Sequence, residues 1–264
     1  MSFEDFSKQF AEQCKICGKK GHNRLGNKIV VCQCQLRAII KYRCETLPVS
    51  LKDLEWIDYT GSSPVNGNVV DIANWQQGRD ISLAYCFSDK SVSHLSGCSY
   101  SMAEVKDFIK HRISNSKIIN RLKEGANLVL LGEDSTGKTL LASLIAKEVI
   151  YASVLLMNMN VKWTSFNTLI NAMNFDRMDF SLLEDLIITD FLFLDNVYRP
   201  HQGDYRKNAI DELFHERLNN KKPTIITGTR PIGDSYSNNR QALGDEFYRM
   251  LNSSYTAKIV LETS

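Results

Sequence analysis

The segment NLVLLGEDSTGKT, residues 127–139, joins a short apolar run to a glycine-rich loop. Its end, Gly132–Thr139, fits the phosphate-loop pattern G-x-x-x-x-G-K-[ST] without a mismatch. The run Asn127–Leu131 predicts a buried strand, and Lys138–Ile150 predicts a helix directly after the loop. A glycine-rich loop between a strand and a helix N-terminus points backbone N–H groups at an anion. The segment therefore predicts an α/β fold with a nucleotide site at this loop.

Two side chains of the loop carry the chemistry of such a site. Lys138 is expected to reach the β- and γ-phosphates of ATP, and Thr139 to offer its hydroxyl to Mg²⁺. Glu133 and Asp134 are unusual beside phosphates, so we expect their side chains to point to solvent. The predicted nucleotide-binding residues are Gly132, Glu133, Asp134, Ser135, Thr136, Gly137, Lys138 and Thr139.

A second apolar run, Phe191–Leu194, ends in Asp195, which predicts the acid that holds Mg²⁺. Many ATPases place an acid next to it to polarise the attacking water. Here the next residue is Asn196, whose amide can orient water but cannot usefully accept a proton. The sequence therefore predicts an ATPase site that binds nucleotide and whose turnover is uncertain. Asp190 is either a substitute base or a solvated loop carboxylate.

Further polar positions fit the sensing of a γ-phosphate. Thr227, Thr229 and Arg230 follow or end a predicted strand, Thr224–Thr227. The alternative interpretation is that β-branched residues simply end a strand. Arg249 lies in a predicted helix, from which an arginine could reach a neighbouring subunit's phosphates or remain a solvated charge. Arg217 and Arg240 are weaker candidates for the same role.

The sequence around these motifs alternates strand-length and helix-length segments, which predicts a parallel sheet with helices on its faces. Ser101, with Glu104 three residues later, predicts the start of a helical region that extends to Leu122. The predicted strand–helix pairs after the phosphate loop are Val154–Met157 with Ser165–Met173, Phe191–Leu194 with Arg206–Leu218, and Thr224–Thr227 with Arg240–Leu251, before a last strand Ala257–Leu261.

Cysteines cluster near the N-terminus. Cys14 and Cys17 form a C-x-x-C pair, and Cys32 and Cys34 form a second pair about fifteen residues later. Two such pairs predict a tetrahedral zinc site; free reduced thiols or a redox pair are the alternatives. His22 and Cys44 are spare candidates for a fourth ligand. A unit this small buries little apolar surface, so the metal would stabilise it.

Composition excludes several classes of protein. The 264 residues are 43% hydrophobic with a net charge of +2, which is ordinary for a globular protein. Residues 1–50 hold nine Lys/Arg against four acids, so the N-terminal part is basic. The start of the chain lacks a signal-peptide pattern, and no apolar run has membrane-spanning length. We therefore expect a cytoplasmic protein with three parts: a zinc-binding domain over 1–46, a linker region over 47–100, and an ATPase domain over 101–264.

The Cys-rich head, Leu47-Pro48, NLVLLGEDSTGKTLLASLIAKEV, DFLFLDNV and KKPTIITGTRP together resemble the DnaC-type helicase loaders. These are AAA+ ATPases of bacteria and phages, related to the IstB-type helpers of transposases. The resemblance implies a zinc-bearing head that binds a DnaB-type replicative hexameric helicase. It also implies a domain that binds ATP and single-stranded DNA and assembles as a spiral oligomer.

The same resemblance makes Thr229 the counterpart of a sensor asparagine and Arg249 the counterpart of an arginine finger. Asn196 and Thr229 depart from the family pattern, and we expect no C-terminal lid, because three residues follow Leu261. Three functions therefore stay open: a helicase loader, a DNA-targeting ATPase for a transposase, and a non-hydrolysing adaptor or inhibitor of the helicase.

Overall fold

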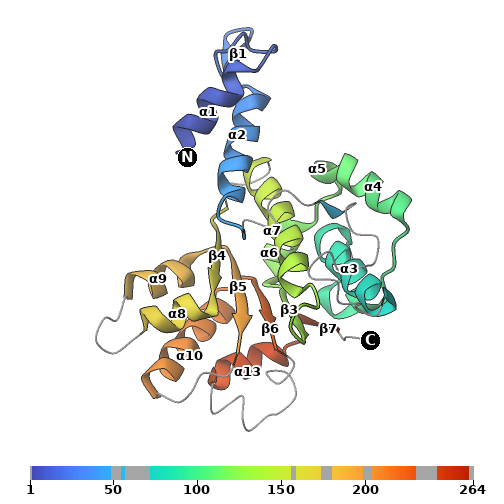
Figure 1. Cartoon of the computed structure of the whole chain (residues 1–264), viewed down its shortest axis with the longest axis vertical. Helices are drawn as coiled ribbons and strands as arrows, with labels where there is room; N and C mark the ends of the chain where they lie inside the picture. Colours follow the sequence, from blue (N-terminus) through green and yellow to red (C-terminus); the bar gives the residue numbers. More distant parts are fainter. Residues whose placement is uncertain are drawn as a thin grey trace.

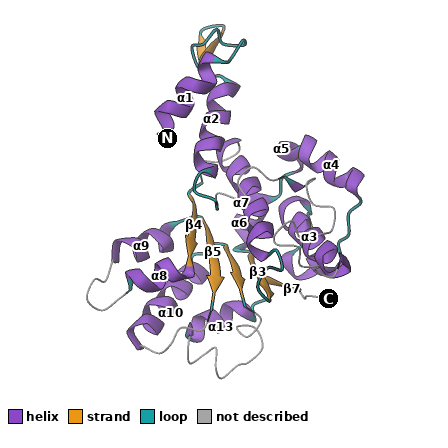
Figure 2. Ribbon diagram, in the orientation of Figure 1, coloured by secondary structure: helices purple, strands orange, loops and turns teal. Residues whose placement is uncertain are grey.

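A five-stranded parallel sheet forms the centre of the molecule (Figures 1 and 2). In this computed structural model, residues 2–48, 55–56, 72–155, 159–173, 180–198, 204–229 and 243–261 are described. The strand order is β4-β5-β6-β3-β7, so β6 separates the strand before the phosphate loop from the strand that ends near Asp195. The strands are β3 (Asn127–Gly132), β4 (Val161–Ser165), β5 (Phe191–Val197), β6 (Thr224–Gly228) and β7 (Thr256–Leu261).

Helices cover both faces of this sheet. Alternate residues of β3 show the two layers: Leu128 and Leu130 join a core with α7, whereas Val129 and Leu131 join a core with α8, α10 and α13. Because both faces are buried, the strands are nearly continuous apolar runs, as expected for a parallel sheet. One layer holds α3 (Ile72–Phe87), α6 (Ile118–Glu124) and α7 (Lys138–Leu155); the other holds α8 (Phe166–Ala172), α9 (Phe180–Ile188), α10 (Asp204–Asn219) and α13 (Asp245–Leu251).

One predicted strand is wrong. Val154 and Leu155, expected to begin the second strand, continue α7, and that strand forms instead at Val161–Ser165. The long apolar stretch shows no one-sided pattern because α7 is buried on nearly every side, so periodicity could not mark its end. The other predicted strands match β3, β5, β6 and β7.

Much of the expected linker region is part of the sheet's packing. Helix α3 and the 3₁₀ helix η2 (Val92–Gly97) bury Leu83, Tyr85 and Leu95 in the same core as β3. Gly78 allows this, since a Cβ there would lie 2.7 Å from a methyl group of Leu261. The described residues from 72 onward therefore form one packed unit with the sheet, which we call the sheet domain.

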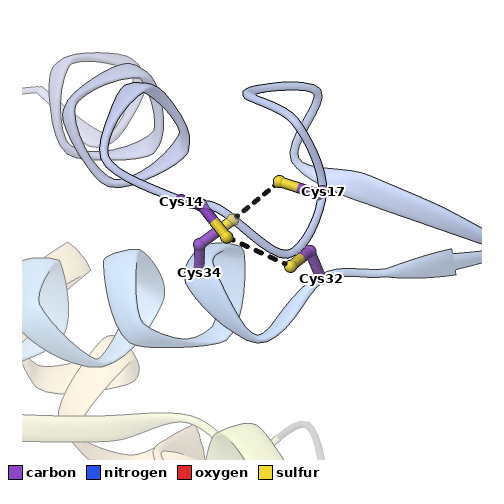
Figure 3. A group of neighbouring side chains, drawn as sticks. All are labelled: Cys14, Cys17, Cys32 and Cys34. Atoms are coloured by element: carbon purple, nitrogen blue, oxygen red, sulfur yellow. Dashed lines mark hydrogen bonds between the residues drawn. The ribbon is translucent and has the colours of Figure 1, made fainter.

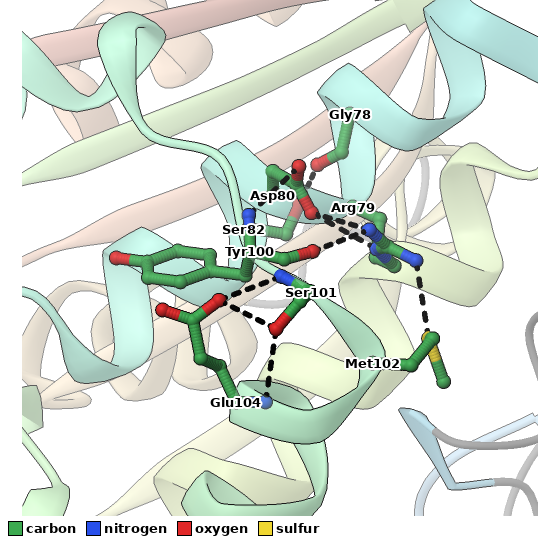
Figure 4. Close-up of polar contacts among 8 residues, drawn as sticks. All are labelled: Gly78, Arg79, Asp80, Ser82, Tyr100, Ser101, Met102 and Glu104. Carbon is green, nitrogen blue, oxygen red and sulfur yellow. Dashed lines mark hydrogen bonds and ion pairs between the residues drawn. The ribbon is translucent and has the colours of Figure 1, made fainter.

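Helix α4 (Met102–Lys110) begins as the sequence predicts. Ser101 Oγ accepts from the Glu104 N–H at 3.3 Å, and the Glu104 carboxylate accepts from the Ser101 N–H at 2.7 Å. Just before it, Asp80 accepts from the Tyr100 N–H, and Arg79 donates to the Tyr100 carbonyl (Figure 4). This buried pair ties α3 to the start of α4, which leads on to α5 (Arg112–Asn115) and α6.

The N-terminal residues form a separate projection at the top of Figure 1, which we call the head (residues 3–44). It consists of α1 (Phe3–Glu12), a hairpin of β1 (His22–Leu25) and β2 (Lys28–Val31), and α2 (Gln33–Cys44). Helix α1 packs on α2, where Gln35 bonds to the Ser7 hydroxyl and carbonyl. At the far end of α2, Arg43 donates to Ser153 Oγ at 2.7 Å, so the helix docks on the end of α7.

A charged cluster lies beside this docking point. Trp56 is fully buried and donates to the Glu148 carboxylate at 3.2 Å. Arg112 pairs with Glu55 at 3.1 Å and with Glu148 at 3.4 Å, and Lys147 pairs with Glu55 at 3.2 Å. These contacts hold Glu55 and Trp56 against α7 and α5. Over the described residues, no helix combines the length and apolar character needed to cross a membrane.

Candidate functional site

The phosphate loop connects β3 to α7, as the sequence predicts. Gly132 packs so closely that a Cβ would lie 2.4 Å from the Leu261 carbonyl oxygen. Gly137 has φ +86°, in the left-handed region that glycine adopts without strain. Gly132, with φ +155°, therefore requires glycine both for space and for backbone conformation, whereas Gly137 requires it for backbone conformation.

Lys138 lies in the loop, almost fully buried, and donates to the Glu133 carbonyl and to Thr136 Oγ1. Burial lowers the pKa of its ammonium, while the nearby Asp134, Asp195 and Glu133 carboxylates oppose that shift. The ammonium thus occupies the loop's interior, bonded to neutral oxygens that a phosphate could replace.

Asp195 is the centre of a hydrogen-bond cluster that spans three elements. Its Oδ1 accepts from Thr139 Oγ1 at 2.9 Å and from Thr227 Oγ1 at 2.5 Å. Thr227 in turn accepts from the Asn196 N–H at 2.8 Å. The helix after the phosphate loop, the end of β5 and the end of β6 therefore meet at one carboxylate oxygen, which is an arrangement suited to a hydrated Mg²⁺.

A register shift in β5 between Leu194 and Val197 produces this geometry. Asn196 sits in the bulge with φ +60°, a conformation that asparagine tolerates better than most residues. Its side chain is exposed at the rim of the site. Asparagine at position 196 therefore replaces the usual acid and also suits the backbone conformation of the bulge.

The cluster lies at one end of a cavity of about 370 Å³. Pro48, which follows the head in the chain, is part of the cavity wall and was not predicted from the sequence. The lining residues are Pro48, Asp134, Ser135, Gly137, Lys138, Thr139, Leu140, Asp195, Asn196 and Thr227.

The residues predicted to sense a γ-phosphate lie in different environments. Thr227 is buried in the cluster, whereas Thr229 lies past the strand and donates its N–H to the Val197 carbonyl. Arg249 is on α13, with a largely exposed side chain that pairs with Glu246 at 3.0 Å. Arg230 and Arg240 lie outside the described residues.

Asp190 and Arg217 have structural contacts instead. Asp190 precedes β5, at the opposite end of the strand from Asp195, and accepts from the Asn160 N–H. Arg217 is buried and donates to the carbonyls of Leu186, Thr189 and Pro223 and to Thr224 Oγ1. The geometry therefore gives neither residue a place beside the phosphates.

The four predicted zinc ligands come together in the head (Figure 3). Their sulfur atoms all lie within 4.8 Å of one another, with Cys14–Cys32 and Cys17–Cys34 each at 3.7 Å. Zn–S bonds of about 2.3 Å in a tetrahedron place sulfurs about 3.8 Å apart, so the four thiols fit zinc. The Gly21 N–H also points at Cys17 Sγ, at 3.3 Å, as a donor to a thiolate would.

The pKa values of two of the thiols shift in opposite directions, whereas the positions of the spare candidates agree with this set of four. Backbone N–H groups, that of Cys17 foremost, lower the pKa of Cys14 to about 6. Burial raises the pKa of Cys34 to about 12. Of the spare candidates, His22 points to solvent on β1, and Cys44 is buried in the core shared with α7. Neither belongs to the group of sulfurs.

Comparison with known proteins gives structural matches alone: no protein-family model and no curated protein matches the chain. The DnaC helicase loader is similar to it, with TM-score 0.42 and 19% identity over 61% of this chain and 92% of that one. DnaI is similar with TM-score 0.44 and 15% identity, over 61% and 86%. The replication initiator DnaA bound to AMPPCP and single-stranded DNA gives TM-score 0.43 and 15% identity, over 60% and 46%. This chain thus spans about half of that DnaA structure.

The parallel sheet, the helices on both of its faces and the phosphate loop between β3 and α7 form a P-loop α/β fold. The cysteine group in the head is a separate site able to bind zinc. The molecule therefore combines a sheet domain that carries a phosphate loop with a projecting head.

Proposed function

We propose that this protein is a DnaC-type helicase loader, which binds a DnaB-type replicative hexameric helicase through its head and uses ATP to place it on single-stranded DNA. The observation that carries the proposal is the union of two sites in one chain: a four-cysteine head and the Thr139–Asp195–Thr227 cluster at the phosphate loop. IstB-type helpers generally lack such a head.

In the nucleotide site, Gly132–Thr139 would hold the phosphates, with Lys138 exchanging its loop oxygens for phosphate oxygens. Thr139 and Asp195 would hold Mg²⁺, which supplies charge neutralisation between the β- and γ-phosphates. Thr227 would keep the Asp195 carboxylate oriented. Arg249, exposed on α13, would reach the nucleotide of a neighbouring protomer, as in a spiral oligomer in the cytoplasm.

In the head, Cys14, Cys17, Cys32 and Cys34 would hold zinc as thiolates, and the metal would stabilise the fold of this small unit.

The test of the proposed function measures binding of the full chain, with and without ATP, to immobilised DnaB-type hexamers. We expect capture of the helicase that is stronger with ATP. Absence of helicase binding in both states, with zinc present, would reject the proposal.

A second candidate, a non-hydrolysing adaptor, is favoured by Asn196 alone, because an amide is a poor proton acceptor. The rate of ATP turnover decides between the loader and the non-hydrolysing adaptor. If hydrolysis is slow for lack of a base, Asn196→Asp should raise the rate by about 10- to 100-fold, since a general base contributes that much or more. Lys138→Ala is the control that should abolish nucleotide-dependent phosphate release; turnover that is negligible in all three proteins supports the adaptor.

A further inference from the structure

The hairpin of the head exposes aliphatic side chains that its own fold does not use. Leu25 is 75% exposed, Ile29 69% and Val31 60%. Every residue of β2 is exposed to solvent. Ile16, in the knuckle before the hairpin, is also largely exposed. Folding alone does not account for these aliphatic residues, because polar residues with high strand propensity, such as Thr, suit an exposed strand position equally well.

The register places these side chains on defined faces. Ile29 lies opposite Arg24, and Val31 lies opposite His22, so one face of the hairpin combines two aliphatic and two basic side chains. Val31 and His22 also line a groove of about 690 Å³ between the hairpin, α1 and α2. The exposed face is thus continuous with a concave surface whose floor includes Phe3, from α1.

Charge on this surface has one sign near the hairpin. Residues 13–31 contain Lys15, Lys19, Lys20, Arg24 and Lys28 and no Asp or Glu. On the α1 side, Glu4 and Glu12 line the groove together with Lys8. A partner that meets the hairpin would therefore gain from carboxylates around an apolar contact.

The same residues favour a protein over a nucleic acid. Sequence-tolerant binding of single strands relies on aromatic side chains on which bases stack. Residues 13–31 contain no Phe, Trp or Tyr, so the contact offered by the hairpin itself is aliphatic, and the aromatic side chain of the adjoining groove is Phe3 of α1. Aliphatic contact with a polar rim is typical of protein interfaces.

We propose that the β1–β2 hairpin face and the adjoining groove are a docking surface for an apolar protein segment flanked by Asp or Glu. Under the proposed function, on which this assignment rests, that segment belongs to the replicative helicase. The surface projects at the end of the molecule away from the sheet, so a partner docks there without covering the nucleotide site (Figure 1).

The test compares full-length variants for binding to an immobilised DnaB-type hexamer. Ile29→Thr combined with Val31→Thr keeps the β-branched shape that suits a strand and removes the apolar surface. We expect binding to weaken about tenfold or more, as for residues at the centre of an interface. Ile113→Thr, at an aliphatic position of α5 that is 52% exposed, should leave binding unchanged. Zinc content measured on each variant verifies that the head is folded.

A charge variant, Arg24→Gln with Lys28→Gln, should weaken binding a few-fold and reduce its dependence on salt, because exposed charges act mainly on association. Lys106→Gln on α4 is its control. Helicase binding that survives both hairpin variants would overturn the docking surface and leave the proposed function standing.

A second probe separates the two proposals. An amphipathic peptide of Leu and Glu is titrated against the wild type, beside a Leu and Lys counterpart and a single-stranded oligonucleotide. If the helicase does not bind but the acidic peptide binds in an Ile29- and Val31-dependent way, the docking surface stands and the loader function fails. Binding of the oligonucleotide that depends on Arg24 and Lys28 but not on Ile29 and Val31 overturns the surface in favour of nucleic acid, and binding of no probe overturns it as well.

Discussion

The head and the sheet domain differ in what holds each of them together. The sheet domain buries two apolar layers on either side of five strands. The head's own cluster consists of Cys17, Cys32 and Cys34 with Phe10 and Cys14 packed against it, while its hairpin leaves aliphatic side chains in water. The sheet domain buries its apolar residues in its own core. The head relies on thiols that fit a metal and exposes apolar residues to water.

The two regions meet along α2. The end of this helix, with Ile40 and Cys44, belongs to the core that contains α7, while its start carries Cys34. One helix is therefore anchored by the apolar layer at one end and by the cysteine group at the other. Removing either kind of support should affect the two regions unequally, and the following predictions use that difference.

The largest effect is expected from loss of the zinc site. Cys14→Ser should abolish stoichiometric zinc binding and unfold α1 and the hairpin, because structural zinc contributes about 10–16 kcal/mol to folding in small domains. Amide hydrogen exchange should show lost protection in the head and unchanged protection in β3 and β5. Cys98→Ser, which alters a half-buried thiol outside the group, is the control. Protein purified without chelators that holds less than half an equivalent of zinc would contradict this picture.

The converse experiment weakens the sheet domain and spares the head. Arg217→Met would remove the guanidinium donor from the carbonyls of Leu186 and Thr189 and would leave the Pro223 carbonyl with the Leu192 N–H alone. Burial already lowers the pKa of this guanidinium to about 9. We expect the free energy of unfolding to fall by about 3 kcal/mol or more, measured by denaturant titration. Arg249→Met, at an exposed position, should change it by less than about 0.5 kcal/mol. Zinc content that falls together with stability would show that the two regions unfold as one.

A smaller, pH-dependent effect is expected where the regions meet. Burial raises the pKa of Glu148 from 4.5 to about 7, against the opposing effects of Arg112, the Trp56 hydrogen bond and Lys147. A carboxyl with a raised pKa in the folded state binds its proton more tightly there than in the unfolded chain. Its contribution to stability is therefore complete below pH 4.5 and is lost as the pH rises through about 7.

Between about pH 5 and pH 8, the wild type should lose on the order of 2–3 kcal/mol that Glu148→Gln does not lose. Glu55 and Tyr151 also face this cluster, so the comparison is made on the slope with pH and not on stability at one pH. Glu212→Gln, at an exposed position of α10, should keep the wild-type slope. Parallel slopes for all three proteins would show that Glu148 is ionised throughout.

The same contrast explains which features could be predicted from the sequence. The phosphate loop, Asp195 and the four cysteines were predictable because their chemistry requires residue types at short, fixed spacings. The packing of α3 was not, because a helix buried on most sides loses the one-sided pattern that marks amphipathic helices. The sequence also did not show that Thr227, and not Thr229, bonds to Asp195. This contact depends on the β5 bulge and on the position of β6 between β3 and β5, and both are properties of the assembled sheet.

That last point gives the smallest and most local prediction. Thr227→Val keeps the side chain's shape but removes the hydroxyl that bonds to Asp195 and accepts from the Asn196 N–H. Loss of one such buried bond costs about 1 kcal/mol, so Mg²⁺-dependent ATP binding should weaken by roughly fivefold. Thr229→Val is the matched control, since the described contact of Thr229 at this position is made by its backbone N–H. Titrating a fluorescent ATP analogue with and without Mg²⁺ measures both variants. If Thr229→Val weakens Mg²⁺-dependent binding as much as Thr227→Val, then the sheet's geometry does not select between the two hydroxyls.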